Sequence, residues 1–401
     1  MRVLLLSNRV PFPPHGGYSI VVYNTIKELL HLGCEVSLFS LNTSKHYVFT
    51  STLNEEILKQ IKFYKYGIDD KIKIKDAFFN LFTRKSYNIS RFYSEGCAHM
   101  LKKVLVENDF DVVQFEGLQV TPYLDTVRAN SKAKIIYRSH NIEFKIWKRL
   151  ALKEGMTPKK LYLNLLSKRL MEYETEVINH FDALFSISHS DEHFFKSIGC
   201  KTSLQSFPVA LNLKEYESTI SLTPHKSIGY IGSMDWRPNV EGLRWFLDQV
   251  WPQIQKLSSG IKFHLAGKNM PVQFSQNYSD YILEGEVDNA LEFISKQHVF
   301  IVPLFSGSGM RVKIIEAMAL GKCVIATSIA AEGIKYQHDK NILIADRADD
   351  FYKQILRCFT DKTLIPRIGK QAKLLVHHHH DIEKESKKML QMYHKLCEKG
   401  V

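Results

Sequence analysis

The sequence lacks the features that mark several classes of protein. It has no stretch of ~18 apolar residues, so nothing in it predicts a helix that spans a membrane. The apolar run Val3–Leu6 is too short for the core of a signal peptide and Arg9 follows closely, so we expect a cytoplasmic protein. The six cysteines are scattered and form no CxxC pair, which predicts free thiols in a reducing compartment.

Metal-binding signatures are also missing. His, Cys and carboxylate residues do not cluster at the spacing of metal ligands, so we expect no metal site. The four consecutive histidines His377–His380 are the one run of residues whose composition resembles a metal-binding cluster. Adjacent histidines on a helix point in different directions and cannot converge on one ion, so we interpret them as the exposed start of the last helix.

What the sequence does contain is typical of a globular protein with more than one domain. The chain has 401 residues, of which 45% are hydrophobic and 24% charged. Single hydrophobic cores stop growing at ~250–300 residues, so we expect two domains.

The net charge of +12 indicates an acidic partner or substrate. Basic residues gather in four clusters, all in the first half, at Lys62–Lys75, Arg84–Arg91, Lys145–Arg149 and Lys159–Arg169. Each cluster alone is compatible with a solvated helix face, but their one-sided distribution favours a surface that meets something acidic. No nucleic-acid recognition motif accompanies the charge, so we expect phosphorylated small molecules or an anionic membrane surface rather than nucleic acid.

Short apolar runs alternate with helical patterns in the first half. The strand-like runs are Val3–Leu6, Glu35–Ser40, Asp111–Phe115, Lys134–Tyr137 and Ala183–Ile187. The clearest helical patterns between them are Ser19–Leu32 and Pro158–His180. Short apolar strands separated by helices predict parallel strands buried on both faces, as in a doubly wound sheet.

The alternation of strand-like and helical segments is interrupted at Ser203–Ser227, which contains Pro, Ser and Thr residues, and resumes in the second half. We interpret the interruption as the domain boundary. The strand-like runs of the second half are Ile228–Ile231, Lys262–Ala266, Tyr281–Leu283, His298–Val302, Cys323–Ala326 and Ile342–Ala345. Its helical patterns are Asn239–Lys256 (broken by Pro252), Arg311–Leu320, Asp349–Phe359 and Asp381–Glu398.

We therefore predict an α/β fold of two Rossmann-like, doubly wound domains. The first domain comprises residues 1–207 and the second 208–376, and the last helix, in residues 377–401, crosses back to the first domain. Ligands of such sheets bind beyond the carboxyl ends of the strands, so functional residues are expected just after strands.

The strongest candidate site follows the strand that ends at Val302-Pro303-Leu304. A glycine-rich loop, Gly307-Ser308-Gly309, leads into a helix, and glycines there let backbone N–H groups approach a phosphate. Arg311 and Lys313 place two cations in the first turn, where they oppose the helix dipole unless an anion binds beside them. Glu316, one turn further, can accept hydrogen bonds from a ribose. The alternative is an ordinary turn with surface cations and a Lys313–Glu316 surface pair.

The run from Gly307 to Thr327 resembles the donor-site signature of the family 4 glycosyltransferases, which have the GT-B fold. The resemblance implies two Rossmann-like domains facing one another across a cleft. It also implies that Glu316 holds the nucleotide ribose. In the family, Glu316 corresponds to the second glutamate of a Glu-x7-Glu pair. Ser308 stands at the position of the first glutamate, which contacts the donor sugar, so this chain departs from the pattern there.

A second departure follows Gly232. The family has an Arg directly after this glycine and a Lys near the start of the next helix, and these cations hold the donor diphosphate. This chain has Ser233 and Pro238 at those positions. Pro238 and Asn239 are equally well explained as helix-start and capping residues.

We expect Arg311 and Lys313 to replace the missing charges, with Arg237 assisting. The sequence Gly-Ser-Met-Asp-Trp-x-Pro-Asn, with Gly-x-Gly-Met-Arg-x-Lys further on, resembles a branch of the family connected with exopolysaccharide and envelope sugar assembly.

Three positions in the first half complete the candidate site. The loop with Gly16 and Gly17 is no GxGxxG fingerprint, which argues against a dehydrogenase. By resemblance this loop reaches the acceptor and the donor phosphate, and His140 lies close to the donor sugar. Glu116 is a third residue at a strand end. Helix capping or a helix-start charge explains His140 and Glu116 equally well.

The resemblance implies a retaining, metal-independent hexosyltransferase with no cofactor beyond its nucleoside diphosphate sugar. His140, Arg311 and Lys313 are then the catalytic candidates, and the acceptor is a glycan or a lipid-linked molecule at the inner face of the cytoplasmic membrane. Two other functions stay open. Sugar-nucleotide epimerases share the fold, and the departures at Ser308, Ser233 and Pro238 are compatible with a non-catalytic binding or scaffold subunit.

Overall fold

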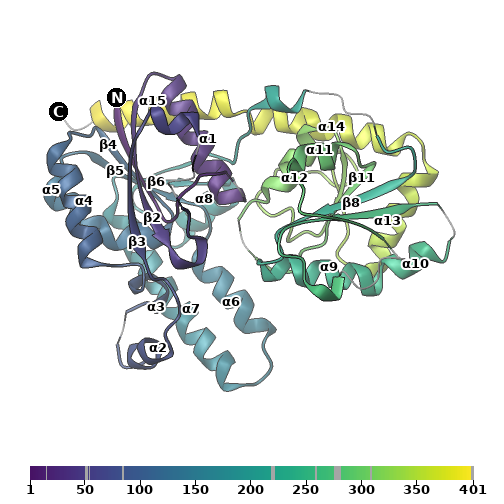
Figure 1. The fold of residues 1–401 in the computed structure, drawn as a ribbon, viewed down its shortest axis with the longest axis horizontal. Coiled ribbons are helices and arrows are strands. Elements are labelled where there is room, and N and C mark those ends of the chain that lie inside the picture. Colours follow the sequence, from purple (N-terminus) through teal and green to yellow (C-terminus); the bar gives the residue numbers. More distant parts are fainter. Residues whose placement is uncertain are drawn as a thin grey trace. The chain divides into compact units, whose positions relative to one another are not determined.

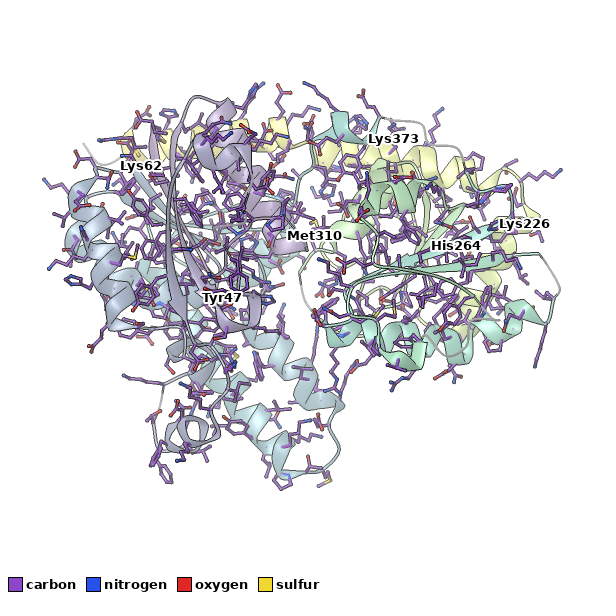
Figure 2. All side chains as sticks on the ribbon, in the orientation of Figure 1. Tyr47, Lys62, Lys226, His264, Met310 and Lys373 are labelled. Atoms are coloured by element: carbon purple, nitrogen blue, oxygen red, sulfur yellow. The ribbon has the colours of Figure 1, made fainter. Side chains whose placement is uncertain are left out.

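The structure is a computed structural model that describes residues 1–14, 16–49, 53, 55–83, 85–217, 222–257, 260–274, 281–307 and 309–398. The chain forms two compact units, Met1–Val209 with Ile382–Val401, and Ala210–Asp381. Each unit is a parallel β-sheet flanked by helices (Figure 1), and side chains fill the space between each sheet and its helices (Figure 2).

The first unit contains a seven-stranded sheet in the order β3-β2-β1-β4-β5-β6-β7. Its strands are β1 (Arg2–Ser7), β2 (Glu35–Thr43), β3 (Lys62–Ile68), β4 (Val112–Glu116), β5 (Lys134–Ser139), β6 (Ala183–Ser186) and β7 (Ser203–Ser206). All neighbouring strands pair in parallel. The central strands are fully buried, as their continuous apolar runs predicted.

Helices cover both faces of this sheet. The helices of this unit are α1 (Gly17–His31), α2 (Ile74–Asn80), α3 (Tyr87–Ser90), α4 (Glu95–Glu107), α5 (Leu124–Asn130), α6 (Glu143–Lys153), α7 (Pro158–Val177), α8 (His189–Ser197) and α15 (Ile382–Glu398). One apolar cluster joins the sheet to α1 and α15, through residues such as Ile26 and Met389. A second cluster joins it to α4, α5 and α7, through residues such as Leu101 and Leu170. The last helix is therefore part of the core of the first unit.

The second unit contains a six-stranded parallel sheet in the order β10-β9-β8-β11-β12-β13. Its strands are β8 (Ser227–Ile231), β9 (Lys262–Ala266), β10 (Ile282–Gly285), β11 (Val299–Val302), β12 (Cys323–Ala326) and β13 (Leu343–Ile344). Its helices are α9 (Arg237–Gln249), α10 (Trp251–Gln255), α11 (Ala290–Ser295), α12 (Val312–Ala319), α13 (Ala348–Thr360) and α14 (Leu364–His379). Pro252 lies in the first turn of α10, where the expected long helix divides into α9 and α10.

The strand order reverses at one place in each sheet. In the first sheet β1 lies between β2 and β4, and in the second β8 lies between β9 and β11. The connections that leave β1 and β4, or β8 and β11, run to opposite sides and leave a crevice beyond the strand ends, where ligands of such sheets bind. Most candidate residues of the sequence lie at or after the ends of these strands, and His140 follows β5, the neighbour of β4.

Four expectations about local structure are wrong. Residues 62–68 of the first basic cluster form the edge strand β3 rather than a helix face, and the polar Ser203–Ser206 forms the opposite edge strand β7 rather than a linker. Helix α14 was not expected, and His377–His379 form its last turn. His380, which follows, is 2% exposed, so the histidines do not form the exposed start of the last helix. Arg311 comes just before α12 instead of within its first turn.

None of the helices in the described part of the chain is long and apolar enough to cross a membrane.

Candidate functional site

The glycine-rich loop after β11 depends on its glycines. Gly307 and Gly309 have φ values of 103° and 80°, a region that side chains disfavour. A Cβ at Gly307 would lie 2.7 Å from Nη2 of Arg311 and 2.8 Å from Cζ2 of Trp236. Only glycine therefore fits at position 307. Ser308, the third candidate of this loop, lies outside the described residues.

Arg311 is built into this loop. Its side chain is buried, its Nη1 donates a hydrogen bond to the carbonyl oxygen of Gly309 at 2.8 Å, and its guanidinium lies 5.1 Å from the centre of the Trp236 ring. The ring comes from the loop after β8, which is the neighbouring strand in the sheet. Arg311 thus places a permanent positive charge at the start of α12 and connects the two loops of the switch point.

Lys313 connects the same two loops one turn deeper. Its Nζ donates hydrogen bonds to the carbonyl oxygen of Ile231 (2.9 Å) and to Oδ1 of Asn239 (3.0 Å), and lies 4.7 Å from the centre of the Tyr230 ring. Burial, together with the charge of Arg311, lowers the pKa of Lys313 to about 7. The interpretation of Lys313 as half of a surface ion pair is wrong, because its hydrogen bonds go to the end of β8 and to α9.

Glu316 lies on the same side of α12, with Tyr216 as its partner. The Tyr216 hydroxyl, from the segment that leads into the second unit, donates a hydrogen bond to Oε1 of Glu316 at 3.4 Å. Burial raises the pKa of Glu316 to about 7, although Tyr216 and Lys313 both oppose the shift. A carboxylate and an ammonium therefore share a half-buried site, and both titrate near neutral pH.

The loop after β8 forms the other wall of this site. Asn239 is buried, and its Nδ2 donates to the carbonyl oxygen of Ser233 at 2.7 Å while its Oδ1 accepts from Lys313. A Cβ at Gly232 would lie 2.8 Å from Nδ2 of Asn239, so this glycine is required by close packing. Asn239 therefore holds the loop and Lys313 together. The sequence suggested that Asn239 only caps a helix, whereas the structure shows that it also bonds to Lys313 and to the loop after β8.

Arg237 lies at the edge of the same region. It is the first residue of α9, its side chain is mostly exposed, and its Nε donates to Oε1 of Glu241 at 2.7 Å. Oε2 of Glu241 in turn accepts a hydrogen bond from Ser306, just before the glycine-rich loop. The proximity of Arg237 to this loop is compatible with its predicted supporting role, which stays a prediction.

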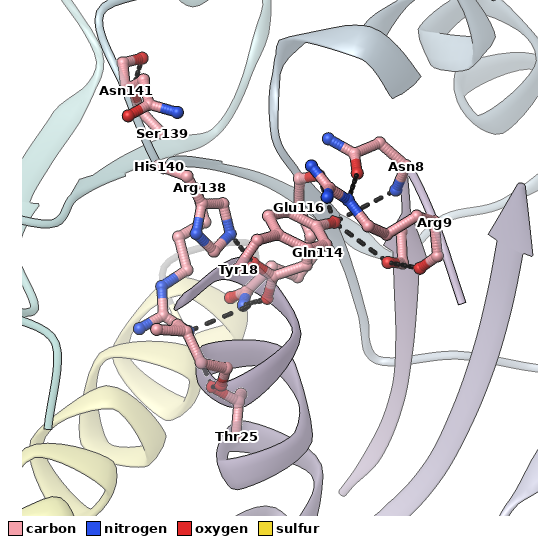
Figure 3. A network of polar contacts seen from close by, with 12 residues as sticks. Asn8, Arg9, Tyr18, Thr25, Gln114, Glu116, Arg138, Ser139, His140 and Asn141 are labelled. Atoms are coloured by element: carbon pink, nitrogen blue, oxygen red, sulfur yellow. Dashed lines mark hydrogen bonds and ion pairs between the residues drawn. The ribbon is translucent and has the colours of Figure 1, made fainter. Parts of the chain in front are cut away.

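The switch point of the first unit holds a second group of polar residues, centred on Glu116 at the end of β4 (Figure 3). Nε2 of His140 lies 2.5 Å from one carboxylate oxygen of Glu116, and Nη1 of Arg138 lies 3.8 Å from the other. Burial raises the pKa of Glu116, but Arg138 and His140 outweigh it and hold the pKa below its usual value. An ionised Glu116 only accepts hydrogen bonds, so Nε2 of His140 carries the proton.

His140 is predominantly neutral in this environment. It is 8% exposed, and burial lowers its pKa although the hydrogen bond to Glu116 acts in the opposite direction. The structure brings Glu116 and His140 together, which the sequence could not show because they follow different strands. A neutral imidazole fixed in one tautomer can position a hydroxyl group or a sugar.

Tyr18 connects this group to the glycine loop of the first unit. Gly16, with φ of 83°, precedes α1, Gly17 begins this helix, and Tyr18 follows. The Tyr18 hydroxyl donates to the carbonyl oxygen of Glu116 at 2.9 Å, and its ring centre lies 4.6 Å from that of His140. Gly16, Gly17, Glu116 and His140 therefore belong to one region of the first unit.

Tyr393, near the C-terminal end of the chain, is connected to Glu116 through buried hydrogen bonds. Tyr393 of α15 donates a hydrogen bond to Oε1 of Gln114 at 2.6 Å, and Nε2 of Gln114 donates to Oε1 of Glu116 at 2.6 Å. Tyr393, Gln114 and Glu116 are all fully buried. Tyr393 and Tyr216 were missed by sequence reasoning because no local pattern distinguishes them from core aromatics. Trp236 belongs to a pattern noted in the sequence, but its contact with Arg311 was not expected.

Among the described residues, no group of three or more His, Cys, Asp or Glu side chains could hold a metal ion.

The second unit matches a known family. Residues 225–361, which include β8, the glycine-rich loop and α12, match the family described as "Glycosyl transferases group 1". The whole chain resembles a Klebsiella pneumoniae protein named "Uncharacterized 44.6 kDa protein in cps region", with 23% identity over 400 residues, 96% of this chain and 97% of that protein.

The fold is similar to that of solved glycosyltransferase structures. Sucrose-phosphate synthase from Thermosynechococcus elongatus matches with a TM-score of 0.71 and 16% identity over 99% of both chains. A glycosyltransferase from Rickettsia africae has a TM-score of 0.68 and 13% identity over 98% of both chains. Anabaena HepE in complex with UDP-glucose has a TM-score of 0.67 and 12% identity, covering 98% of this chain and 100% of that one. The prediction of an α/β, GT-B fold with two Rossmann-like units is confirmed.

Proposed function

We propose that the protein transfers a hexose from a nucleoside diphosphate sugar to a hydroxyl group of a glycan or lipid-linked acceptor during cell-surface polysaccharide synthesis. The observation that carries this proposal is the group formed by Arg311, Lys313 and Glu316 around the glycine-rich loop. It lies at the switch point of the second sheet, within the residues that match the family of group 1 glycosyl transferases. The structural similarity to Anabaena HepE, which was solved in complex with UDP-glucose, supports the donor class.

The donor diphosphate is proposed to bind at the start of α12. Backbone N–H groups of Gly307 and Gly309 and the helix N-terminus favour an anion there. Arg311 supplies a fixed positive charge, and an anion beside Lys313 would favour its protonated form despite the lowered pKa. The two cations then stand in for the Arg and Lys that the family has where this chain has Ser233 and Pro238.

Glu316 is proposed to hold the ribose. An ionised carboxylate accepts hydrogen bonds from two vicinal hydroxyl groups, and Tyr216 already orients one of its oxygens. The raised pKa of Glu316 means that donor binding draws this group into its ionised form.

The chemistry is proposed to proceed with retention and without a metal ion. The bond between the anomeric carbon and the diphosphate oxygen breaks, the acceptor oxygen bonds to that carbon on the same face, and the hydroxyl proton passes to the departing diphosphate. Arg311, Lys313 and the loop N–H groups stabilise the negative charge that develops on the diphosphate. We propose that neutral His140, held by Glu116, positions the donor sugar.

The acceptor side rests on gene context and charge. The Klebsiella relative is named for a cps (capsule polysaccharide) region, which supports a role in polysaccharide assembly. The excess of basic residues in the first half of the chain supports an acceptor presented at an anionic membrane surface, at the inner face of the cytoplasmic membrane.

A thermal-shift screen with UDP, GDP, ADP and their sugars tests the donor site. A ligand at ~100 times its Kd stabilises the folded protein by ~2.7 kcal/mol. We expect one base to shift the wild type and the matched control Glu292→Ala, which alters an exposed glutamate of α11, but not Glu316→Ala. If no nucleotide shifts the wild type with or without candidate acceptors, the donor site is absent and a scaffold role is favoured.

Product analysis then separates transfer from epimerisation. Incubation with the identified donor alone yields an epimerised sugar only if the protein is an epimerase. Our proposal predicts nucleoside diphosphate release that accelerates when an acceptor glycan is added, with unchanged anomeric configuration in the product. An inverted product would refute retention but not transfer.

A further inference from the structure

Part of the first unit extends away from its sheet. Figure 1 shows α2 together with the hairpin of α6 and α7 projecting beyond the strands. Arg169 of α7 ties the two pieces together, because its Nη1 donates to the carbonyl oxygen of Asn80 at 2.8 Å and its Nη2 to that of Leu81 at 3.0 Å. We call the described residues of Lys71–Lys85 and Lys145–Arg169 the basic spur.

The basic spur exposes large apolar side chains to solvent. The most exposed are Met156 (99%), Phe82 (78%), Leu161 (74%), Leu152 (68%), Phe79 (67%) and Ile72 (62%). Three of them flank the turn between α6 and α7. Single exposed apolar residues are normal, but several gathered at the tip of a projection indicate a surface that contacts an apolar environment.

The net charge of the basic spur is strongly positive. Between Lys145 and Arg169 the sequence has eight Lys and Arg residues against a single acid, Glu154, and between Lys71 and Lys85 it has five against Asp76 alone. Glu154 is itself bonded to Lys159. The apolar tip is therefore surrounded by an excess of positive charge.

We infer that the basic spur docks on an anionic lipid bilayer. Exposed apolar side chains that enter the headgroup region, with Lys and Arg around them that meet anionic lipids, are the combination that holds peripheral proteins at such surfaces. A second copy of the chain fits less well, because pairing two spurs brings like charges together. This inference deepens the proposed function and rests on it for its biological sense, since the spur would bring the transferase to a lipid-linked acceptor.

Cosedimentation with vesicles tests the inference without donor or acceptor. The full-length protein is mixed with phosphatidylcholine vesicles that either contain or lack phosphatidylglycerol. We expect it to pellet with the anionic vesicles, less so as salt rises, and to remain in solution with the neutral ones. Absence of pelleting with anionic vesicles at low salt, or equal pelleting with both kinds, would overturn the proposal.

Two variants separate the apolar and the electrostatic contributions. The triple variant Leu152→Ser, Met156→Ser, Leu161→Ser removes the tip, and we expect vesicle affinity to fall roughly tenfold or more. Lys148→Glu with Lys153→Glu should weaken binding and reduce its dependence on salt. All of these side chains are exposed, so circular dichroism should show an unchanged fold.

A matched variant on α4, outside the spur, controls for general effects of charge and polarity. It combines Val106→Ser, a position 68% exposed, with Lys102→Glu and Lys103→Glu. We expect this control to bind anionic vesicles almost as the wild type does. If it loses as much affinity as the spur variants, net charge alone drives binding and the spur is no docking surface.

Two further measurements keep this inference separate from the proposed function. Spur variants should retain the thermal shift with the donor nucleotide, and a wild type that binds vesicles but no nucleotide would refute the function while leaving the docking surface intact. Sedimentation velocity without vesicles examines the competing occupant. A dimer of the wild type that disappears in the triple serine variant would assign the tip to self-association and overturn the inference.

Discussion

Lys313 of α12 donates a hydrogen bond to the carbonyl oxygen of Ile231 at the end of β8. It thereby links the helix that follows β11 to the end of β8, the two strands between which the strand order of the second sheet reverses. An ammonium in a half-buried site loses part of its hydration, and a carbonyl oxygen is a weak partner for it. The position of Lys313 is therefore better explained by binding of an anion than by a contribution to the stability of the fold. Replacing Lys313 is accordingly the most direct test of the proposed site.

Replacing Lys313 should separate activity from stability. We expect Lys313→Met to reduce kcat/KM with the identified donor by about 100- to 1000-fold, or ~2.7–4 kcal/mol, if the ammonium stabilises the departing diphosphate. The melting temperature should stay close to that of the wild type, because the variant removes a half-buried charge. Lys322→Met is the matched control, since Lys322 is also a lysine of lowered pKa bonded to a backbone carbonyl in this unit. Equal activity losses in both variants would remove Lys313 from the site.

Donor affinity should depend on pH with a maximum near neutrality. The pKa of Glu316 is raised to about 7 and that of Lys313 is lowered to about 7. Below this pH Glu316 takes up a proton and accepts hydrogen bonds from the ribose hydroxyls less well. Above it Lys313 loses the positive charge that attracts the diphosphate. Titration calorimetry of the nucleotide across this range should give a bell-shaped profile. In Glu316→Gln the acid limb should disappear, and its persistence would show that another group titrates.

Glu174 should make the first unit less stable as pH rises. It is buried, and burial together with nearby Glu143 raises its pKa to about 8. Its folded-state pKa lies above its unfolded value, so the stability it contributes is present below the unfolded pKa and is lost as pH rises toward 8. Denaturant unfolding should show that wild-type stability declines over this interval more steeply than that of Glu174→Gln. The N–H groups of Glu143 and Phe144 donate to different oxygens of Glu174, and the single amide oxygen of the glutamine keeps one of these two hydrogen bonds. Parallel profiles would contradict the shift.

Tyr393→Phe should destabilise the first unit. The change leaves Oε1 of Gln114 without its buried donor, which costs about 1–3 kcal/mol. Urea unfolding measures this loss, and Tyr47→Phe, at a half-exposed ring, serves as the control. A role in positioning beyond stability would show as an altered NMR titration of His140, because Gln114 also orients Glu116. An unchanged His140 titration would limit Tyr393 to structural support.

Much of the architecture could be predicted from local patterns. Continuous apolar runs such as those of β1 and β5 identify central parallel strands, since both faces of such strands are buried. The edge strands β3 and β7 were not predicted, because solvent on their outer side permits polar and charged residues in their sequences. Helix α14 escaped because Pro366 and Gly369 read as helix breakers, although Gly369 is needed where the helix crosses the backbone of Gly321.

The candidate site was predictable only in part, and for a different reason. Gly307, Arg311, Lys313 and Glu316 are contiguous enough to be recognised as a loop and a helix start. The partners that define their environment, Tyr216, Trp236 and Asn239, arrive from other segments through tertiary packing. Sequence spacing along one helix could not show that Lys313 bonds across to β8 and away from Glu316.

The return of α15 to the first unit has a consequence for how the protein is made. Met389, Met392 and Tyr393 complete a core whose strands were synthesised at the very beginning of the chain. On the ribosome the second unit has all its strands and helices available before the first unit can close, although domains commonly fold in the order of their synthesis. The first half of the chain must therefore wait, with an apolar face uncovered, until translation is nearly finished.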